Sequence, residues 1–291
     1  MFGLSGQVGV AFADALSPSD PVCVAPSRRP QAARRGVRWL ASGFDGFDGL
    51  APEGPVAAIA SLGPLDGFVD WFERSSLAPA RVVALSSTSV HAKRDSPDPA
   101  ERALARVLRA CEQRLADLAR VRGCALTVLR PTLIYGNGRD HNISRLVATA
   151  RRWRVLPLPS PARGLRQPVH AGDVAAAVLA CLRKPRPRPG FFDLPGGETL
   201  PFRVMVERSL AAGAPGARLL PLPAPLVRLA VRGLGRIGRG PALGEGFLAR
   251  LEQDLVYDGQ PASDALGHVP RGFRPTAEAF PPLGAAQHRA P

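Results

Sequence analysis

The sequence predicts an α/β fold, a doubly wound parallel sheet with a smaller, mainly helical C-terminal lobe. Three observations support this prediction. Glycines recur at every third position in the opening turn, and short apolar segments alternate with helical segments as far as residue 130. After about residue 197 the chain is rich in proline and helical in pattern. Alternation of strand and helix is typical of a parallel sheet that carries helices on both faces.

The opening turn has the chemistry of an anion site. Its glycines precede an apolar run, 8–16, that suits a helix packed on a sheet. Glycine lets the backbone approach a pyrophosphate, and the free N–H groups of a helix N-terminus stabilise negative charge. The sequence therefore predicts a dinucleotide site formed by Gly3, Ser5, Gly6, Gln7, Val8 and Gly9.

A second strand, 21–25, follows at the spacing of a βαβ unit and ends near Arg28 and Arg29. An acidic residue at this place suits the ribose hydroxyl of NAD, whereas arginine suits the 2′-phosphate of NADP. We therefore expect NADP, with NAD as the alternative. Only Met1 and Phe2 precede the glycines. The expectation is that the first strand is truncated and that this weakens the fold.

Composition narrows the class of protein. The 291 residues are 45% hydrophobic, enough for one or two domains with a large core. The sequence contains no run of about 18 uncharged apolar residues, so a membrane span is not expected. Four scattered cysteines without a Cys-x-x-Cys pair predict reduced thiols in the cytoplasm and no metal site.

The net charge of +14 comes almost entirely from arginine, since Lys93 and Lys184 are the only lysines. Basic residues do not alternate with aromatic ones, so nucleic-acid binding is not expected. Arg228, Arg232 and Arg236 mark a basic amphipathic helix, either a solvated face or a peripheral membrane contact. The nearby glycine pattern 233–238 follows no strand, and we do not expect it to bind a cofactor.

The remaining elements follow in chain order. The residues 86–89 are hydroxyl-bearing and come directly after a strand, where ligands bind in open α/β sheets. Asp98, Pro99 and Glu101 are start signals for a helix that runs to about residue 122. The expected strands are 37–40, 56–60, 81–85, 125–129 and 191–194, and the other expected helices are 68–72 and 174–184.

Four motifs occur together and in order: the glycine turn, the serines after 81–85, the segment LRPTLIYG at 129–136, and RQPVHAGDV at 166–174. By these motifs the chain resembles the extended short-chain dehydrogenase/reductase family, the NAD-dependent epimerases and dehydratases of nucleotide sugars. The likeness covers roughly residues 3–282. It implies a Rossmann-type cofactor domain at 1–132 and 166–196, a substrate-binding lobe at 133–165 and 197–285, and a tail at 286–291.

The resemblance also implies roles for single residues. Ser87 matches the catalytic serine or threonine that hydrogen-bonds the reacting sugar oxygen. Asn142 and Arg166 match the positions that hold the substrate diphosphate. Further cofactor contacts are expected at Ser61, Ser86, Pro131 and Thr132.

The chain departs from the family at the proton-transfer pair. Active members use Tyr-x-x-x-Lys, and neither of the two tyrosines here has a lysine four residues later. Leu104 and Leu108 stand at the matching positions. His91 is a candidate substitute base because histidine titrates near neutral pH, although the interpretation as an exposed loop residue is favoured. His170 is interpreted as structural.

Two functions therefore remain open. One is an NAD(P)-dependent nucleotide-sugar epimerase, dehydratase or reductase with a rearranged base. The other is an inactive dinucleotide-binding protein with a structural, sensing or assembly role. The sequence leaves the oligomeric state open.

Overall fold

The main sheet is parallel. A computed structural model describes residues 1–43, 56–138, 140, 142–185, 188–223, 225–226 and 245–281. Its four-stranded sheet has the order β10-β5-β4-β3, and every neighbouring pair is parallel. These strands are β3 (Ala58–Ser61), β4 (Arg81–Leu85), β5 (Ala125–Pro131) and β10 (Gly190–Leu194). The predicted parallel α/β sheet is confirmed.

A second parallel pair extends this sheet through the first two residues. The pair consists of β1 (Cys23–Ser27) and β2 (Val37–Ala41). The Phe2 N–H donates to the Ala60 carbonyl at 2.8 Å, and the Met1 ammonium donates to the Val24 carbonyl at 2.8 Å. Residues 1–2 thus lie between β3 and β1, and they complete the order β2-β1-(1–2)-β3-β4-β5-β10.

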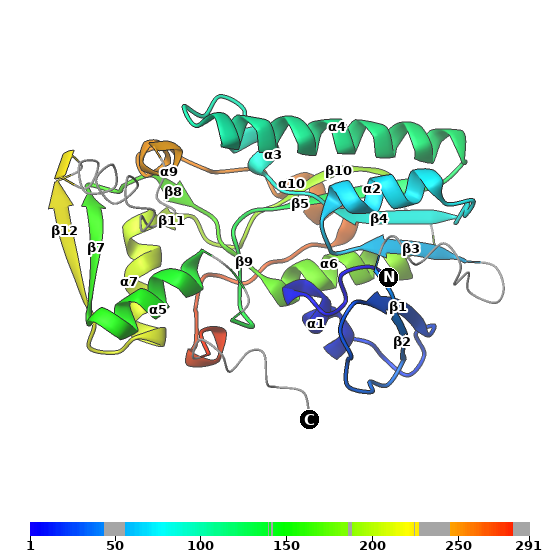
Figure 1. The fold of residues 1–291 in the computed structure, drawn as a ribbon, viewed down its shortest axis with the longest axis horizontal. Helices are drawn as coiled ribbons and strands as arrows, with labels where there is room; N and C mark the ends of the chain where they lie inside the picture. The colour runs from blue at the N-terminus through cyan, green and yellow to red at the C-terminus, as the bar shows by residue number, and fades with distance from the viewer. Residues whose placement is uncertain are drawn as a thin grey trace.

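Helices cover both faces of the sheet (Figure 1). On one face lie α1 (Gln7–Asp14) and α6 (Ala171–Arg183), whose apolar side chains share a core with β3, β4 and β5. On the other face lie α2 (Leu65–Arg74) and α4 (Pro99–Val121), which pack an aromatic cluster against the sheet. The short helices α3 (Ser89–Ala92) and α10 (Gln260–Leu266) complete this unit. Its three layers match the doubly wound prediction.

Capping explains where two of these helices begin. The Asp98 carboxylate accepts from the Ala100 N–H at 2.9 Å, and proline occupies the next position, as the sequence predicted for α4. At α6, the His170 Nδ1 accepts from the Gly172 N–H at 3.0 Å. His170 is therefore an N-cap, which agrees with its structural interpretation.

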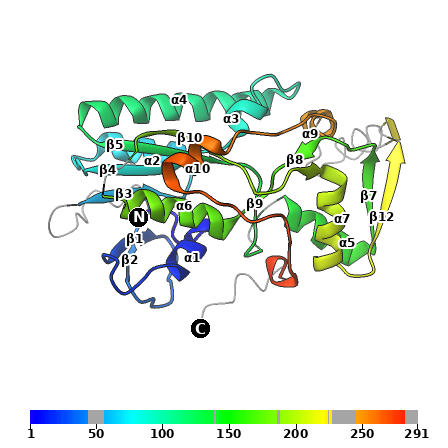
Figure 2. The same ribbon diagram turned by 180° about the vertical axis from the view of Figure 1, so that it is seen from behind.

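The second unit lies at the other end of the molecule, as the two opposite views show (Figures 1 and 2). Its own core is formed around α5 (Ile143–Trp153) and α7 (Phe202–Gly213). It also contains a parallel strand pair, β7 (Val155–Ser160) with β12 (Arg218–Pro223). The remaining elements are β6 (Ile134–Tyr135), β8 (Leu165–Arg166), β9 (Val169–His170), β11 (Leu200–Pro201), α9 (Glu245–Arg250) and the 3₁₀ turn η1 (Ala277–Ala279).

The strand β12 lies in the segment after residue 197 that the sequence analysis expected to be mainly helical. Leucine and proline alternate in β12 and in its partner β7. Proline lacks an N–H and is tolerated in edge strands, so a two-stranded pair accepts it where a helix interior does not.

Several segments that the sequence analysis singled out lie outside the described residues: the glycine pattern 233–238, the basic segment marked by Arg228, Arg232 and Arg236, and the tail 286–291. Within the residues that are described, none of the helices has the length and apolar character needed to cross a bilayer. All four cysteines are free thiols.

Candidate functional site

A cleft of about 330 Å³ opens where the main strands end and α1 begins. Parallel strands bring their carboxyl ends to one edge, so residues that follow β3, β4 and β5 meet here. The lining residues are Gln7, Val8, Leu62, Gly63, Pro64, Leu65, Leu85, Ser86, Leu108, Pro131 and Ile134. Five residues that the sequence analysis singled out therefore converge here: Gln7, Val8, Ser86, Leu108 and Pro131.

The glycine turn is packed so tightly that side chains are excluded from two of its three glycines. Gly3 has φ +74°, and a Cβ there would lie 2.5 Å from the Gly63 nitrogen. A Cβ on Gly9 would lie 2.3 Å from the Leu4 carbonyl oxygen. Gly6 is different, because a Cβ there would meet only the Gly3 oxygen, at 3.1 Å. Gly3 and Gly9 shape the turn, and Gly6 is the N-cap that leaves space beside the helix end.

Two buried hydroxyls at this edge lack a partner. Ser61 Oγ at the end of β3 and Ser86 Oγ just after β4 have no hydrogen-bond partner among the described residues. An unpaired buried hydroxyl costs free energy and usually indicates a missing ligand or water. Together with the glycine turn, these donors fit a dinucleotide that crosses the carboxyl ends of β3 and β4.

The turn after β6 closes the cleft from the side of the second unit. Gln7 Nε2 donates to the Gly136 carbonyl at 2.7 Å, and Asn137 Nδ2 donates to the Gln7 carbonyl at 3.1 Å. Gly136 has φ +99°, and a Cβ there would lie 2.7 Å from His170 Nε2. The Gln7 side chain thus holds this turn against α1.

Arg28 and Arg29 are exposed and follow the carboxyl end of β1, where the sequence placed them. The backbone beneath them is held by Ser27, whose hydroxyl donates to the Arg29 carbonyl at 2.8 Å. Both side chains therefore lie at the rim of the sheet and are exposed.

Residues 86–89 form the serine loop, and their hydroxyls point in two different directions. Ser86 faces the cleft, whereas Ser87 Oγ lies 3.1 Å from Ser89 Oγ and accepts from the Ser89 N–H, also at 3.1 Å. Thr88 is buried, and both its N–H and its hydroxyl donate to the Pro131 carbonyl, at 3.2 and 3.3 Å. The loop is therefore fastened to the wall of the cleft through Pro131.

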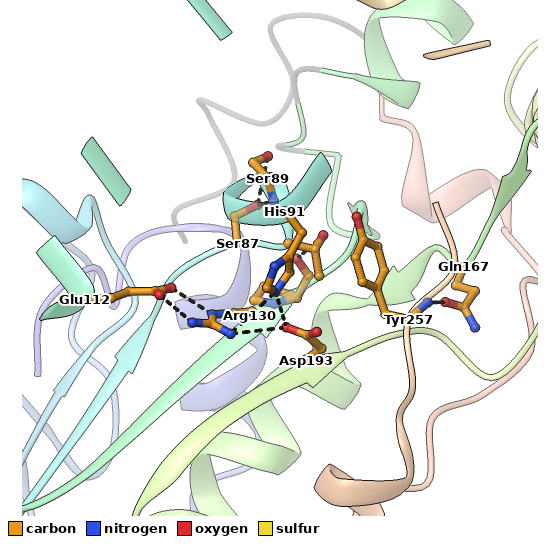
Figure 3. A network of polar contacts seen from close by, with 10 residues as sticks. Ser87, Ser89, His91, Glu112, Arg130, Gln167, Asp193 and Tyr257 are labelled. Atoms are coloured by element: carbon orange, nitrogen blue, oxygen red, sulfur yellow. Dashed lines mark hydrogen bonds and ion pairs between the residues drawn. The ribbon is translucent and has the colours of Figure 1, made fainter. Parts of the chain in front are cut away.

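His91 faces away from Ser87 and joins a charged network (Figure 3). Its Nε2 lies 3.4 Å from Asp193 Oδ1 and 3.4 Å from Arg130 Nη1. Arg130 in turn binds the nearly buried Glu112 through two hydrogen bonds. The structure does not join His91 to Ser87, the pair that the sequence suggested.

The two leucines that the resemblance matched to the tyrosine and lysine of the proton-transfer pair lie on α4. Leu108 lines the cleft beside Ser86, and Leu104 is 42% exposed. The wall that would carry the proton-transfer pair is therefore apolar.

The other residues implied by the resemblance are partly committed to the protein itself. Thr132 Oγ1 donates to the Gln167 carbonyl. Asn142 is exposed at the N-terminus of α5. Arg166 is only 7% exposed, and its guanidinium donates to the carbonyls of Leu165, Gln253 and Arg250. Burial lowers the pKa of Arg166 to about 10, and the charge of Asp254 opposes this shift.

The segment that supplies these carbonyls is itself fastened to the cofactor unit. Arg250, at the end of α9, pairs with Glu101 in the first turn of α4. Glu101 also accepts from Ser96 Oγ at 2.7 Å and lies 3.7 Å from Lys93 Nζ. A single carboxylate therefore connects α9 to the loop that follows the serines.

The sequence analysis did not identify two residues near the site, Asp140 and Tyr257. Asp140 caps α5 by accepting from the N–H groups of Asn142 and Ser144, at 3.1 and 2.9 Å, and the spacing of aspartate, asparagine and serine carried that signal. Tyr257 lies beside His91, with ring centroids 5.9 Å apart. No local motif marks Tyr257, because it is 166 residues from His91 in sequence.

Comparisons with known proteins agree with the resemblance stated from the motifs. Residues 68–192 match the model of the NAD dependent epimerase/dehydratase family. A UDP-glucose 4-epimerase from Vibrio cholerae is 25% identical over 175 residues, which are 58% of this chain and 51% of that protein. The match thus spans about half the length of this curated relative.

Solved structures share the fold over nearly the whole chain. UDP-glucuronic acid 4-epimerase from Bacillus cereus, in complex with NAD, superposes with a TM-score of 0.69 at 12% identity, covering 96% of this chain and 95% of that one. MoeE5, in complex with UDP-glucuronic acid and NAD, gives 0.70 at 17% identity, covering 96% of each chain. TunA, an NAD dependent NDP-hexosamine 5,6-dehydratase, gives 0.67 at 16% identity, with coverage of 96% and 93%.

Proposed function

We propose that this protein is an NAD(P)-dependent enzyme of the nucleotide-sugar epimerase, dehydratase or reductase type that works without the Tyr-x-x-x-Lys pair. One observation carries the proposal. Ser86 lines the cleft and Ser61 ends the neighbouring strand β3, and neither hydroxyl has a hydrogen-bond partner among the described residues.

The cofactor would be held by this chain as follows. Gly6 leaves room for the pyrophosphate at the α1 N-terminus, Ser61 and Ser86 supply hydroxyls, and Pro131 forms the wall. Arg28 and Arg29 support a preference for NADP, because arginine pairs with a 2′-phosphate. The bound nicotinamide supplies hydride transfer.

The substrate we propose is a nucleotide sugar or a molecule of similar chemistry. The relatives whose names include UDP-glucuronic acid and UDP-glucose support this class. Asn142 and Arg166 are the candidates for its diphosphate, and Ser87 is the candidate for hydrogen bonding at the reacting oxygen. Leu108 in the cleft excludes the usual tyrosine–lysine chemistry at this wall, which keeps the binding-only alternative under test.

Cofactor titration tests the proposal directly. Ser86→Ala removes a hydroxyl that has no partner in the described structure, so its melting temperature should equal or exceed that of wild type while NADPH binds roughly tenfold more weakly. Ser209→Ala is the matched control, because its buried hydroxyl donates to Met205 within α7, far from the cleft. Failure of wild type to bind either dinucleotide would overturn the proposal.

Turnover separates the two functions. We expect conversion of at least one member of a UDP-sugar panel, which includes 4-keto sugars, with NADP(H) as cofactor. Binding of both cofactor and UDP-sugar without any turnover would support the binding-protein alternative.

A further inference from the structure

Tyr257 is held at the serine loop by contacts from three directions (Figure 3). Its backbone N–H donates to Gln167 Oε1 at 2.8 Å, and its side chain hydrogen-bonds to Thr88. Its ring lies against that of His91. The residue is half-buried.

The position of Thr88 connects this tyrosine to the cleft. The Thr88 hydroxyl donates to the carbonyl of Pro131, and Pro131 lines the cleft. The phenol therefore lies at the end of a chain of contacts that leads through Thr88 to the cofactor wall.

We infer that Tyr257 is the proton donor of this site, taking the place of the tyrosine missing at position 104 and approaching the serine loop from the opposite side. The inference rests on the proposed function. It differs from the suggestion that His91 is the base, since His91 Nε2 faces Asp193 and Arg130.

The pKa of the Tyr257 phenol suits the role of an acid. Burial raises the pKa of Tyr257, and the charge of Asp193 raises it further, while the Thr88 hydrogen bond and Arg166 oppose this. The phenol is protonated at neutral pH and is suited to donate a proton when a carbonyl is reduced. We write the step in that direction, with a keto sugar nucleotide as the substrate.

The step balances with the reduced cofactor as reductant. The carbonyl carbon accepts hydride and gains a C–H bond, the π electron pair moves to the oxygen, and that oxygen takes the proton of Tyr257. The sugar is reduced to an alcohol, the dinucleotide is oxidised, and Tyr257 is left as a phenolate that solvent reprotonates past the half-exposed His91 ring.

The only other tyrosine supplies a matched control. Tyr135 is 1% exposed, packs edge-on against His170 and Phe273, and lies in the core of the second unit. Tyr257→Phe should lower kcat for NADPH-dependent reduction of a UDP-4-keto sugar by about 10²–10⁴-fold. The Kd for NADPH should stay unchanged. Tyr135→Phe should keep kcat within a few-fold of wild type.

A second measurement does not depend on turnover. In Tyr135→Phe, Tyr257 is the single tyrosine, so its ionisation can be followed by tyrosinate absorbance. Saturation with NADP⁺ should move the titration midpoint down by roughly one pH unit or more, because a nearby positive nicotinamide favours phenolate.

The outcomes are distinct. Absence of dinucleotide binding overturns the proposed function and this inference with it. Bound cofactor with a fully active Tyr257→Phe overturns the inference alone. If wild type reduces none of the keto sugars, an unchanged midpoint under saturating NADP⁺ overturns the inference, and a lowered midpoint supports it.

Discussion

Arg130 binds both carboxylate oxygens of Glu112, at 2.9 and 2.5 Å, and so joins β5 to α4. The two side chains are only 17% and 5% exposed. The helix that carries Leu104 and Leu108 is thus fixed to the sheet by a buried, bidentate ion pair. His91 and Asp193 sit directly against this pair.

Removing one partner of this pair should be severe. We expect Glu112→Gln to lose about 3–5 kcal/mol of unfolding free energy, because the Arg130 charge stays buried without its counter-ion. Glu73→Gln, which breaks an exposed contact with Arg114, should lose about 1 kcal/mol or less. Urea unfolding of both variants measures the difference, and equal losses would contradict the assignment.

Cofactor choice should depend on the rim arginines. Arg28→Ala and Arg29→Ala should each weaken NADPH binding roughly tenfold or more, since a charge-assisted contact is worth ~1.5–3 kcal/mol before screening. NADH binding should not change, because NADH lacks the 2′-phosphate. Arg35→Ala is the control, as Arg35 is exposed at the amino end of β2, away from the cleft. Calorimetric titration of both cofactors measures these affinities. A wild-type protein that prefers NADH would rule out the assignment.

Mild acid should lower the stability of the protein through the His170 N-cap of α6. Burial lowers the pKa of His170 below its ordinary 6.5, so the folded protein keeps the ring neutral as an acceptor for Gly172. As pH falls below 6.5, the unfolded chain binds a proton that the folded chain resists, and stability is lost through the lower folded pKa. In His170→Asn, a non-titrating cap, melting temperature should fall less steeply between pH 7.5 and 5. His268 is also buried with a lowered pKa, so the melting temperature of the variant should still fall to some extent as the pH falls. Parallel curves for variant and wild type would refute this role.

The competing proton-transfer assignments give different kinetic patterns. If His91 were the base, His91→Ala should lower kcat by about 10²–10⁴-fold. With Tyr257 as donor, we expect a loss of less than about tenfold in His91→Ala, and a larger loss in Ser87→Ala if Ser87 orients the reacting oxygen. Steady-state rates on one keto substrate distinguish the patterns, and a large loss in His91→Ala would favour the histidine.

Local sequence signals predicted the framework well. The strand 81–85 was predicted to the residue, and the start of α4 was predicted from its cap. These features depend on periodicity and capping, which a short window contains. The glycine turn and Ser86 also converge on one cleft as expected.

The rest depends on contacts between distant segments. Arg166 matched a ligand position in sequence, yet it is buried by carbonyls some 85 residues away. Tyr257 showed no motif because its partners lie in the serine loop and at Gln167. The strand β12 was missed because its proline content resembles a loop until β7 supplies a pairing edge.

Arg166 donates to three backbone carbonyls, two of which belong to α9 and the segment after it. The proposed binding of a substrate diphosphate would therefore depend on α9 as well as on Arg166. A diphosphate that takes this guanidinium must displace the carbonyls of Arg250 and Gln253, and Arg250 is the residue that anchors α9 to Glu101. If Arg166 holds a diphosphate as proposed, the factor by which release of α9 raises diphosphate affinity equals the factor by which bound diphosphate favours that release. Under this proposal Glu101, which pairs with Arg250, would influence how tightly the diphosphate binds.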